Sequence, residues 1–217
     1  MSIEQNYEKR LNQILINDDF KEISILNRGF VITKQIATQS LLFIGINPSY
    51  KERKSEQPKS ITLFDDNRNT SYNYFKKFEI IVNDLKLKYN IDITWHHLDL
   101  LFYRNTSQKY FDQLVKEKNG KKFIIEQLEI SKEIIETSQP KIIVINNTLA
   151  RELIQDKIDL DFKFNYKIEF DKKIGTHRLS ENGTPIFFTS MLTGQRALDL
   201  GSFERLTWHI KFVLDKL

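Results

Sequence analysis

Short apolar segments alternate along this chain with amphipathic ones, and this alternation limits the fold more than any other feature. The short segments have the character of strands that other elements cover on both faces; they are residues 40–46, 91–101, 141–145 and 185–189. The helical segments repeat apolar residues every three or four positions; they are residues 70–89, 121–138, 148–155 and 198–217. The alternation predicts an α/β fold in which helices flank an open parallel sheet.

The rest of the chain is less regular. Residues 4–16 have the apolar spacing of a further helix, and residues 50–69 are polar and rich in turn formers, which predicts a long loop. Residues 162–180 fit either an edge hairpin or an irregular excursion. Because no linker or repeat interrupts the chain, we expect a single domain over residues 1–217, with residues 1–39 as a helical or extended appendage.

The composition excludes several classes of protein. The 217 residues include no cysteine, which excludes a disulfide scaffold, a thiolate nucleophile, a cysteine-ligated zinc site and an iron–sulfur cluster. No apolar run approaches the roughly 20 residues of a membrane span, and the N-terminal residues lack an apolar signal core. We therefore expect a cytoplasmic monomer that does not bind membranes. The net charge of +4 permits nucleic-acid binding but does not require it.

In an open parallel sheet the ligand binds beyond the carboxyl ends of the strands, so the residues that follow each predicted strand are candidates for a site. The first strand runs into the turn at residues 45–49 (GINPS), where proline stiffens the chain and asparagine offers a donor and an acceptor. The spacings GxxxxGK[ST] and GxGxxG are absent, which argues against a phosphate loop and a dinucleotide cofactor. His96 and His97 point to opposite faces of a strand and cannot share a metal ion. We expect neither a metal nor a cofactor.

The segment LLFIGINPS at residues 41–49 resembles motif A of the uracil-DNA glycosylase superfamily, and most closely the mismatch-specific uracil/thymine glycosylases. Residues 69–75 resemble the approach to that family's first long helix. The segments at residues 97–104 and 141–153 are also similar in placement to strand ends of the family. The resemblance implies a three-layer α/β/α fold with a central four-stranded parallel sheet in the order 2-1-3-4.

The same resemblance implies a monofunctional DNA glycosylase, which flips uracil or another altered pyrimidine out of DNA and hydrolyses its N-glycosidic bond. Asn47 and Asp99 would be the catalytic residues, with Asn47 positioning the attacking water. As a carboxylate, Asp99 accepts hydrogen bonds only and would favour an amino group on the base, unless it caps a turn or pairs with Arg104 instead. The implied base-binding residues are Gly45, Ile46, Pro48, Ser49, Tyr50, Phe64 and Tyr103, with Tyr50 or Phe64 stacked on the base. The implied DNA-binding residues are Lys51, Arg53, Lys54, Arg104, Ser190, Met191, Leu192, Thr193, Gln195 and Arg196.

The chain departs from this family after its last predicted strand. Motif B in the family is a His-Pro-Ser or Asn-Pro-Ser loop, whereas residues 189–196 contain neither histidine nor proline. A second hypothesis is therefore a catalytically inactive protein of the same fold that binds a nucleotide or a nucleic acid. A third is an unrelated open-sheet enzyme that acts on a small metabolite, which a strand order other than 2-1-3-4 would favour.

Overall fold

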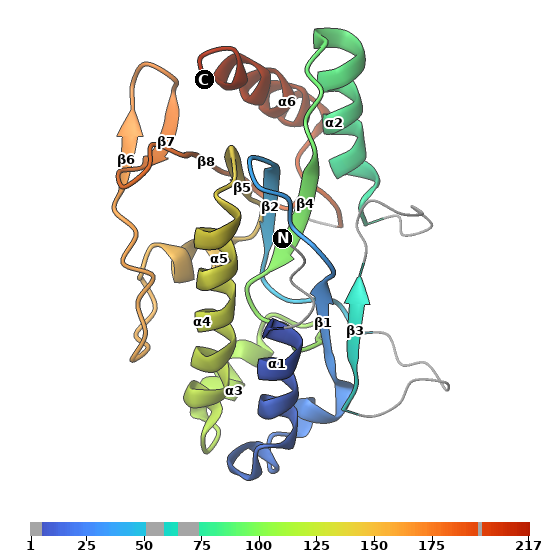
Figure 1. Ribbon diagram of the computed structural model, residues 1–217, viewed down its shortest axis with the longest axis vertical. Helices are drawn as coiled ribbons and strands as arrows, with labels where there is room; N and C mark the ends of the chain where they lie inside the picture. Colours follow the sequence, from blue (N-terminus) through green and yellow to red (C-terminus); the bar gives the residue numbers. More distant parts are fainter. Residues whose placement is uncertain (1–5, 51–58, 65–73, 195–196) are drawn as a thin grey trace.

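The computed structural model describes residues 6–50, 59–64, 74–194 and 197–217, which form a larger and a smaller sheet together with helices (Figure 1). The larger sheet has six strands in the order β4-β2-β5-β8-β7-β6. Its parallel strands are β2 (Leu41–Gly45), β4 (Trp95–Asp99), β5 (Ile142–Ile145) and β8 (Pro185–Phe188). Numbered along the chain, these four lie in the order 2-1-3-4, with the first of them inside the sheet.

The prediction of a four-stranded sheet is wrong, because a hairpin extends the sheet to six strands. β6 (Ile168–Asp171) pairs antiparallel with β7 (Thr176–Leu179), and β7 pairs antiparallel with β8. The hairpin covers backbone groups of β8 that would otherwise form an open edge of the parallel sheet. Of the two possibilities for residues 162–180, the edge hairpin is therefore the observed one.

Alternate residues of β2 face two different cores, as they must in a sheet that is covered on both sides. Leu42 and Ile44 face one core, whereas Leu41 and Phe43 face the other. Helices accordingly lie on both faces of the sheet (Figure 1). The helices of the first core are α1 (Asn6–Ile16), α3 (Tyr110–Lys116), α4 (Gly120–Ser138) and α5 (Thr148–Ile154), and those of the second are α2 (Lys76–Tyr89) and α6 (Leu200–Leu214).

A smaller sheet pairs β1 (Phe30–Thr33) with β3 (Ile61–Phe64) in parallel. The prediction of an uninterrupted loop over residues 50–69 is therefore wrong, because the described part of that segment contains β3. The register places Thr33 opposite Phe64, and β1 is in turn attached to the main body through an isolated bridge between Phe30 and Tyr103. This small sheet stands beside β4 in Figure 1 and forms one side of the cavity described below.

Residues between Tyr7 and Ile36 contribute to the main core. Two 3₁₀ helices, Asp18–Phe20 and Ser24–Arg28, join α1 to β1, and Phe20 packs edge-on against Phe123 of α4 with the ring centroids 5.4 Å apart. Within the described ranges, none of the helices combines the length and the apolar character that crossing a membrane requires.

Candidate functional site

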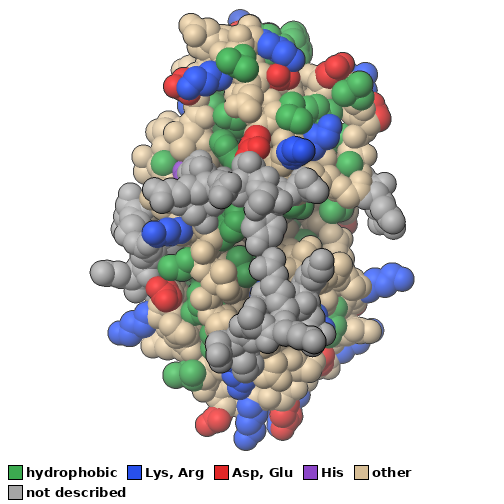
Figure 2. Space-filling view, turned by 90° about the vertical axis from the view of Figure 1, so that its right-hand side faces the viewer, with side chains coloured by type: hydrophobic (Ala, Val, Ile, Leu, Met, Phe, Trp, Pro, Cys, Tyr) green, Lys and Arg blue, Asp and Glu red, His purple; other side chains and the backbone are tan. Residues whose placement is uncertain are grey.

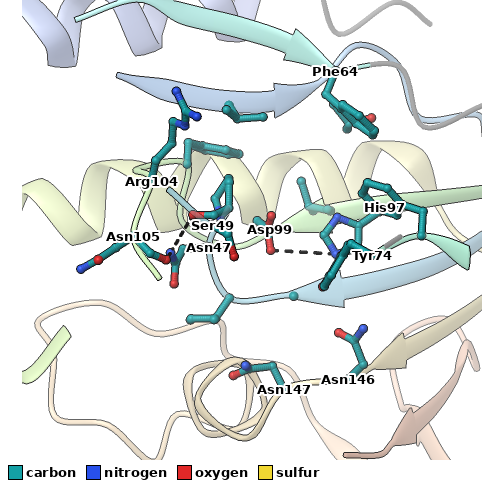
Figure 3. Close-up of a pocket in the computed structure, with 18 of the residues that line it drawn as sticks. Asn47, Ser49, Phe64, Tyr74, His97, Asp99, Arg104, Asn105, Asn146 and Asn147 are labelled. Carbon is teal, nitrogen blue, oxygen red and sulfur yellow. Dashed lines mark hydrogen bonds and ion pairs between the residues drawn. The ribbon is translucent and has the colours of Figure 1, made fainter. Parts of the chain in front are cut away.

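A cavity of about 480 Å³ opens at the carboxyl edge of the parallel strands (Figure 3). It is lined by the carboxyl ends of β2, β4 and β5, by residues 191–193 after β8, and by β1 and β3. The volume lies within the roughly 300–1,000 Å³ that is usual for small-molecule sites. After β2 the chain forms β4 on one side of that strand and later β5 on its other side. Open α/β sheets bind ligands at such a switch point.

Gly45 makes the close arrangement at the end of β2 possible. A Cβ atom at position 45 would lie only 2.3 Å from Oδ1 of Asp99 and 3.0 Å from Nε2 of His97, both on the neighbouring strand β4. Any larger residue would therefore push the Asp99 carboxyl group from its place. Glycine at this position lets the Asp99 and His97 side chains approach β2 beside the cavity.

The side chain of Asn47 is held in one orientation. Its Nδ2 donates hydrogen bonds to the backbone oxygen of Asn105 at 2.6 Å and to that of Pro48 at 3.0 Å. The backbone N–H of Asn105 donates to the same Pro48 oxygen at 2.9 Å, which ties the turn after β2 to the segment after β4. Because its amide nitrogen is engaged in this way, Asn47 has its Oδ1 left to accept a hydrogen bond from a water or a ligand.

Two side chains of helix α4 hold the irregular segment that follows β4 through hydrogen bonds. Gln127 is fully buried, and its Oε1 accepts hydrogen bonds from the backbone N–H groups of Phe102 at 2.9 Å and Tyr103 at 3.1 Å. Ser131 Oγ, one turn further along α4, donates to the backbone oxygen of Leu100 at 2.6 Å. These contacts satisfy backbone groups that no strand partner satisfies, and they position the backbone that holds Asn47.

Burial makes both Asp99 and His97 neutral at ordinary pH. It raises the pKa of Asp99 to about 8 and lowers the pKa of His97 to about 3. At pH 7 Asp99 is therefore mainly a carboxylic acid, which carries a donor as well as an acceptor. This result differs from the sequence argument, which treated Asp99 as a carboxylate that only accepts hydrogen bonds.

Aromatic rings line part of the cavity, and Figure 3 shows Phe64 across from Asn146 and Asn147. The ring of Phe64 stacks on that of Phe75, with the centroids 5.0 Å apart and the planes 21° apart. Tyr74 contacts the His97 ring edge-on, with the ring centroids 5.7 Å apart. The cavity thus combines an apolar aromatic side with a set of amide, carboxyl and hydroxyl groups.

Most of the described residues that the sequence singled out lie on this one cavity. They are Gly45, Ile46, Asn47, Pro48, Ser49, Phe64, Asp99, Arg104, Met191, Leu192 and Thr193.

Three other predicted residues do not line the cavity. Tyr103 is 2% exposed and stacks on Phe123 in the core, because the chain turns inward directly after β4. Tyr50 instead contacts two arginines, since the guanidinium groups of Arg28 and Arg104 lie 4.7 and 5.2 Å from the centroid of its ring. Ser190 is exposed to solvent. The remaining predicted residues, Lys51, Arg53, Lys54, Gln195 and Arg196, lie outside the described residues.

Sequence reasoning missed several residues of the cavity. Asn146 follows the buried strand β5 directly, so the strand-end rule that selected Asn47 could have selected it as well. Tyr74 and Asn105 carry no comparable signal, because their positions depend on how the segments before α2 and after β4 fold. Across the described residues, no three His, Asp or Glu side chains gather in the manner of a metal site.

No known protein family matches this chain, and no curated protein matches it either. The function is therefore inferred from the chemistry of the cavity and from the motif at residues 41–49.

Proposed function

We propose that this protein is a DNA glycosylase of the uracil-DNA glycosylase type, which hydrolyses the N-glycosidic bond of uracil or another altered pyrimidine in DNA. The observation that carries the proposal is the position of Asn47, whose side chain Asn105 holds on a switch-point cavity that Asp99 also lines. The strand order β4-β2-β5-β8 is the order that the resemblance implies, and it counts against the unrelated-enzyme hypothesis.

The cavity suits a base that has been flipped out of the DNA stack. It is large enough for a small planar ligand, and it offers the Phe64–Phe75 stack as an aromatic surface. Stacking on an aromatic ring is worth about 1–3 kcal/mol per base, which offsets much of the few kcal/mol that flipping costs.

The polar groups suit the chemistry of glycosidic hydrolysis. As the C1′–N1 bond breaks, its electron pair leaves with the base and negative charge develops on the base carbonyl oxygens. The O–H of Asp99 would donate a hydrogen bond to such an oxygen, as a carboxylic acid kept neutral by burial does. Asn47 Oδ1 would accept a hydrogen bond from the water that attacks C1′, and that water then loses its proton to solvent.

Asp99 would also substitute for the histidine that the family carries in the loop after its last strand. The loop at residues 189–194 contains no histidine to stabilise the leaving base. In the proposed mechanism the O–H of Asp99, at the end of β4, takes the role of that histidine. A preorganised hydrogen-bond donor stabilises the charge on the leaving base whichever residue supplies it.

The DNA contacts would come from the rim of the cavity. Arg104 lines it and stacks on Tyr50 beside Arg28, whose guanidinium donates to Oδ1 of Asn105 at 3.0 Å. On the face in Figure 2, Lys and Arg side chains are interspersed with Asp and Glu, and hydrophobic side chains lie between them. We therefore expect a few specific phosphate contacts from arginine and not binding through a uniform basic surface.

The test is release of free base from oligonucleotides that contain a single uracil, either single-stranded or paired with adenine or guanine. We expect release by the wild-type protein and a loss of about 100-fold or more in rate for Asn47→Ala. Asn12→Ala, at an exposed position of α1 off the cavity, is the matched control and should retain the wild-type rate.

The inactive-binder hypothesis gives a different result. No base would be released from any oligonucleotide, yet the wild-type protein would bind uracil-containing DNA, and Asn47→Ala would weaken that binding. Absence of both release and binding would reject both functions.

A further inference from the structure

Arg28 lies in the second 3₁₀ helix, outside the segments that carry the glycosylase resemblance, yet it reaches the residues beside the cavity. Its Nη1 donates to Oδ1 of Asn105 at 3.0 Å and to the backbone oxygen of Arg104 at 3.4 Å. Asn105 is also the residue whose backbone oxygen holds the Asn47 amide at 2.6 Å. The Arg28 guanidinium is therefore only one residue removed from the proposed catalytic side chain.

The guanidinium of Arg28 keeps one edge available for a ligand. Nη1 makes both of these hydrogen bonds, and within the described parts of the chain Nε and Nη2 donate to no atom. Nor does any carboxylate of those parts lie within ion-pair distance of Arg28. The Nε–H and Nη2–H groups point in parallel and form the fork with which arginine binds two oxygen atoms of a phosphate. A partly buried arginine with an unused fork and no acidic partner indicates an anion that arrives with the ligand.

A second arginine contacts the same aromatic ring as Arg28. The guanidinium groups of Arg28 and Arg104 both lie near the Tyr50 ring, and such cation–π contacts hold the two cations in place. The backbone oxygen of Tyr50 accepts a hydrogen bond from Thr106 Oγ1 at 2.8 Å, which ties it to the segment after β4. Figure 3 shows Arg104 at the same end of the cavity as Asn47. Two cations are thus fixed around one ring beside the catalytic end of the cavity.

We propose that Arg28 and Arg104 form a phosphate site, which binds a DNA phosphate next to the flipped nucleotide. This inference rests on the proposed function and assigns a binding role to the segment before β1. When a nucleotide rotates out of the stack, its two flanking phosphates stay attached to it and lie beside the pocket that receives the base. Arg28 supplies the bidentate fork, and Arg104 adds a second positive charge on the same anion.

The experiment measures binding of single-stranded oligonucleotides by fluorescence anisotropy and needs no turnover. Each carries one 2′-fluoro-2′-deoxyuridine, whose glycosidic bond resists hydrolysis because fluorine destabilises the cationic sugar. A neutral methylphosphonate replaces a single phosphate on the 5′ side of this nucleotide, on its 3′ side, or several nucleotides away. We expect one flanking replacement to weaken binding by the wild-type protein about tenfold relative to the distant one, because it removes a charge-assisted contact. This comparison does not depend on how any variant folds.

Arg28→Ala should bind the three methylphosphonate probes with affinities within about twofold of one another, and its dependence of log affinity on log salt should be shallower by about one. Arg28→Lys keeps the charge without the planar fork, so it should restore the salt dependence and only part of the preference. Arg205→Ala is the matched control, because Arg205 is an exposed arginine of α6 that does not line the cavity. This control should bind every probe like the wild-type protein.

Three results would overturn the inference: no binding of the oligonucleotides, equal binding of all three methylphosphonate probes by the wild-type protein, or a preference among them that survives Arg28→Ala. Failure of the proposed function has a different signature. In that case the protein releases no base from DNA, but its binding still depends on one flanking phosphate and on Arg28.

Discussion

Nε2 of His97 lies 3.9 Å from Oδ1 of Asp99, yet the two side chains do not form an ion pair at neutral pH. Burial lowers the pKa of His97 to about 3 and raises that of Asp99 to about 8, so each favours its neutral form. The side chains are only 7% and 14% exposed, and removing two charges from water costs more than their attraction across this distance returns. The pair therefore presents an uncharged imidazole and a carboxylic acid to the cavity.

This arrangement predicts that stability falls as the pH rises from 6.5 to 8. In that window the folded protein keeps a proton on Asp99, whereas the unfolded chain, with an aspartate pKa of 3.8, has lost it. The folded state thus binds one more proton, and the free energy of unfolding declines by up to about 1.4 kcal/mol per pH unit. Urea unfolding measures this effect. The difference in the free energy of unfolding between the wild-type protein and Asp99→Asn should change with pH by this amount.

Between pH 4 and 6.5 the contribution of His97 has the opposite sign. The unfolded histidine, with a pKa of 6.5, is protonated there and the folded one is not, so this group makes stability rise with pH and offsets Asp99. Asp99→Asn should uncover that rise. If the free energies of unfolding of the two proteins instead change in parallel between pH 6.5 and 8, Asp99 is ionised in the folded state and cannot donate to the base.

Gly45→Ala should reduce base release by displacing Asp99. The new methyl group would lie 2.3 Å from Oδ1, so the carboxyl group must rotate away from the cavity edge. Such overpacking costs about 1–3 kcal/mol of stability. We expect a rate reduction well beyond the small loss of folded protein, measured as base release per folded molecule.

Gly201→Ala is the appropriate control for this change. Gly201 lies in α6, and its added Cβ would have Asp199 Oδ1 as nearest neighbour at an ordinary 3.4 Å. Alanine favours helix over glycine by about 1 kcal/mol, so this variant should be at least as stable as the wild type and equally active. Equal activity of Gly45→Ala would mean that the position of Asp99 is unimportant for the reaction.

The central strands could be predicted from the sequence because burial on both faces leaves a continuous apolar run. β2, β5 and β8 begin and end within one or two residues of the predicted segments. β1 and β3 could not be predicted, since each has four residues and β3 is only partly buried. Their pairing joins segments about 30 residues apart, and no local pattern records such a contact.

The candidate site, like the fold, could be predicted from the sequence only in part. Asn47 could be located because the strand-end rule needs only the strand boundaries. Asp99 lies inside the predicted strand at residues 91–101, so that rule did not select it, and only the family resemblance pointed to it. Tyr103 was assigned to the base and lies in the core, because the direction of a side chain in the irregular segment after β4 depends on tertiary contacts. The protonation of Asp99 likewise depends on burial, which the sequence does not give.

Phe64→Ala should weaken base binding about tenfold or more, because stacking contributes about 1–3 kcal/mol per base. Phe64 lies on the cavity and is stacked on Phe75, so its ring is held in place before a base enters. Calorimetry with 1-methyluracil measures the effect. Phe170→Ala, at a 56% exposed position on the edge strand β6, should bind like the wild-type protein. Unchanged affinity of Phe64→Ala would show that the base stacks elsewhere.

Gln127→Met should damage both stability and activity although Gln127 does not line the cavity. The substitution keeps the approximate size of the side chain but leaves the N–H groups of Phe102 and Tyr103 buried without an acceptor. Each orphaned group costs about 1–3 kcal/mol, so we expect the free energy of unfolding to fall by about 2–6 kcal/mol. The segment after β4 would shift, and the backbone oxygen of Asn105 would no longer hold Asn47 at 2.6 Å.

The rescue variant separates this positioning role from general loss of packing. Gln127→Glu keeps an Oε1 acceptor for both N–H groups but loses the Nε2 donor that now bonds the Phe123 oxygen at 2.9 Å. It should recover much of the base-release rate per folded molecule while remaining less stable than the wild type, since it buries an acidic group. A Gln127→Met protein that is as stable and active as the wild type would show that the two hydrogen bonds do not position the site. Equal losses for both variants would point to packing alone.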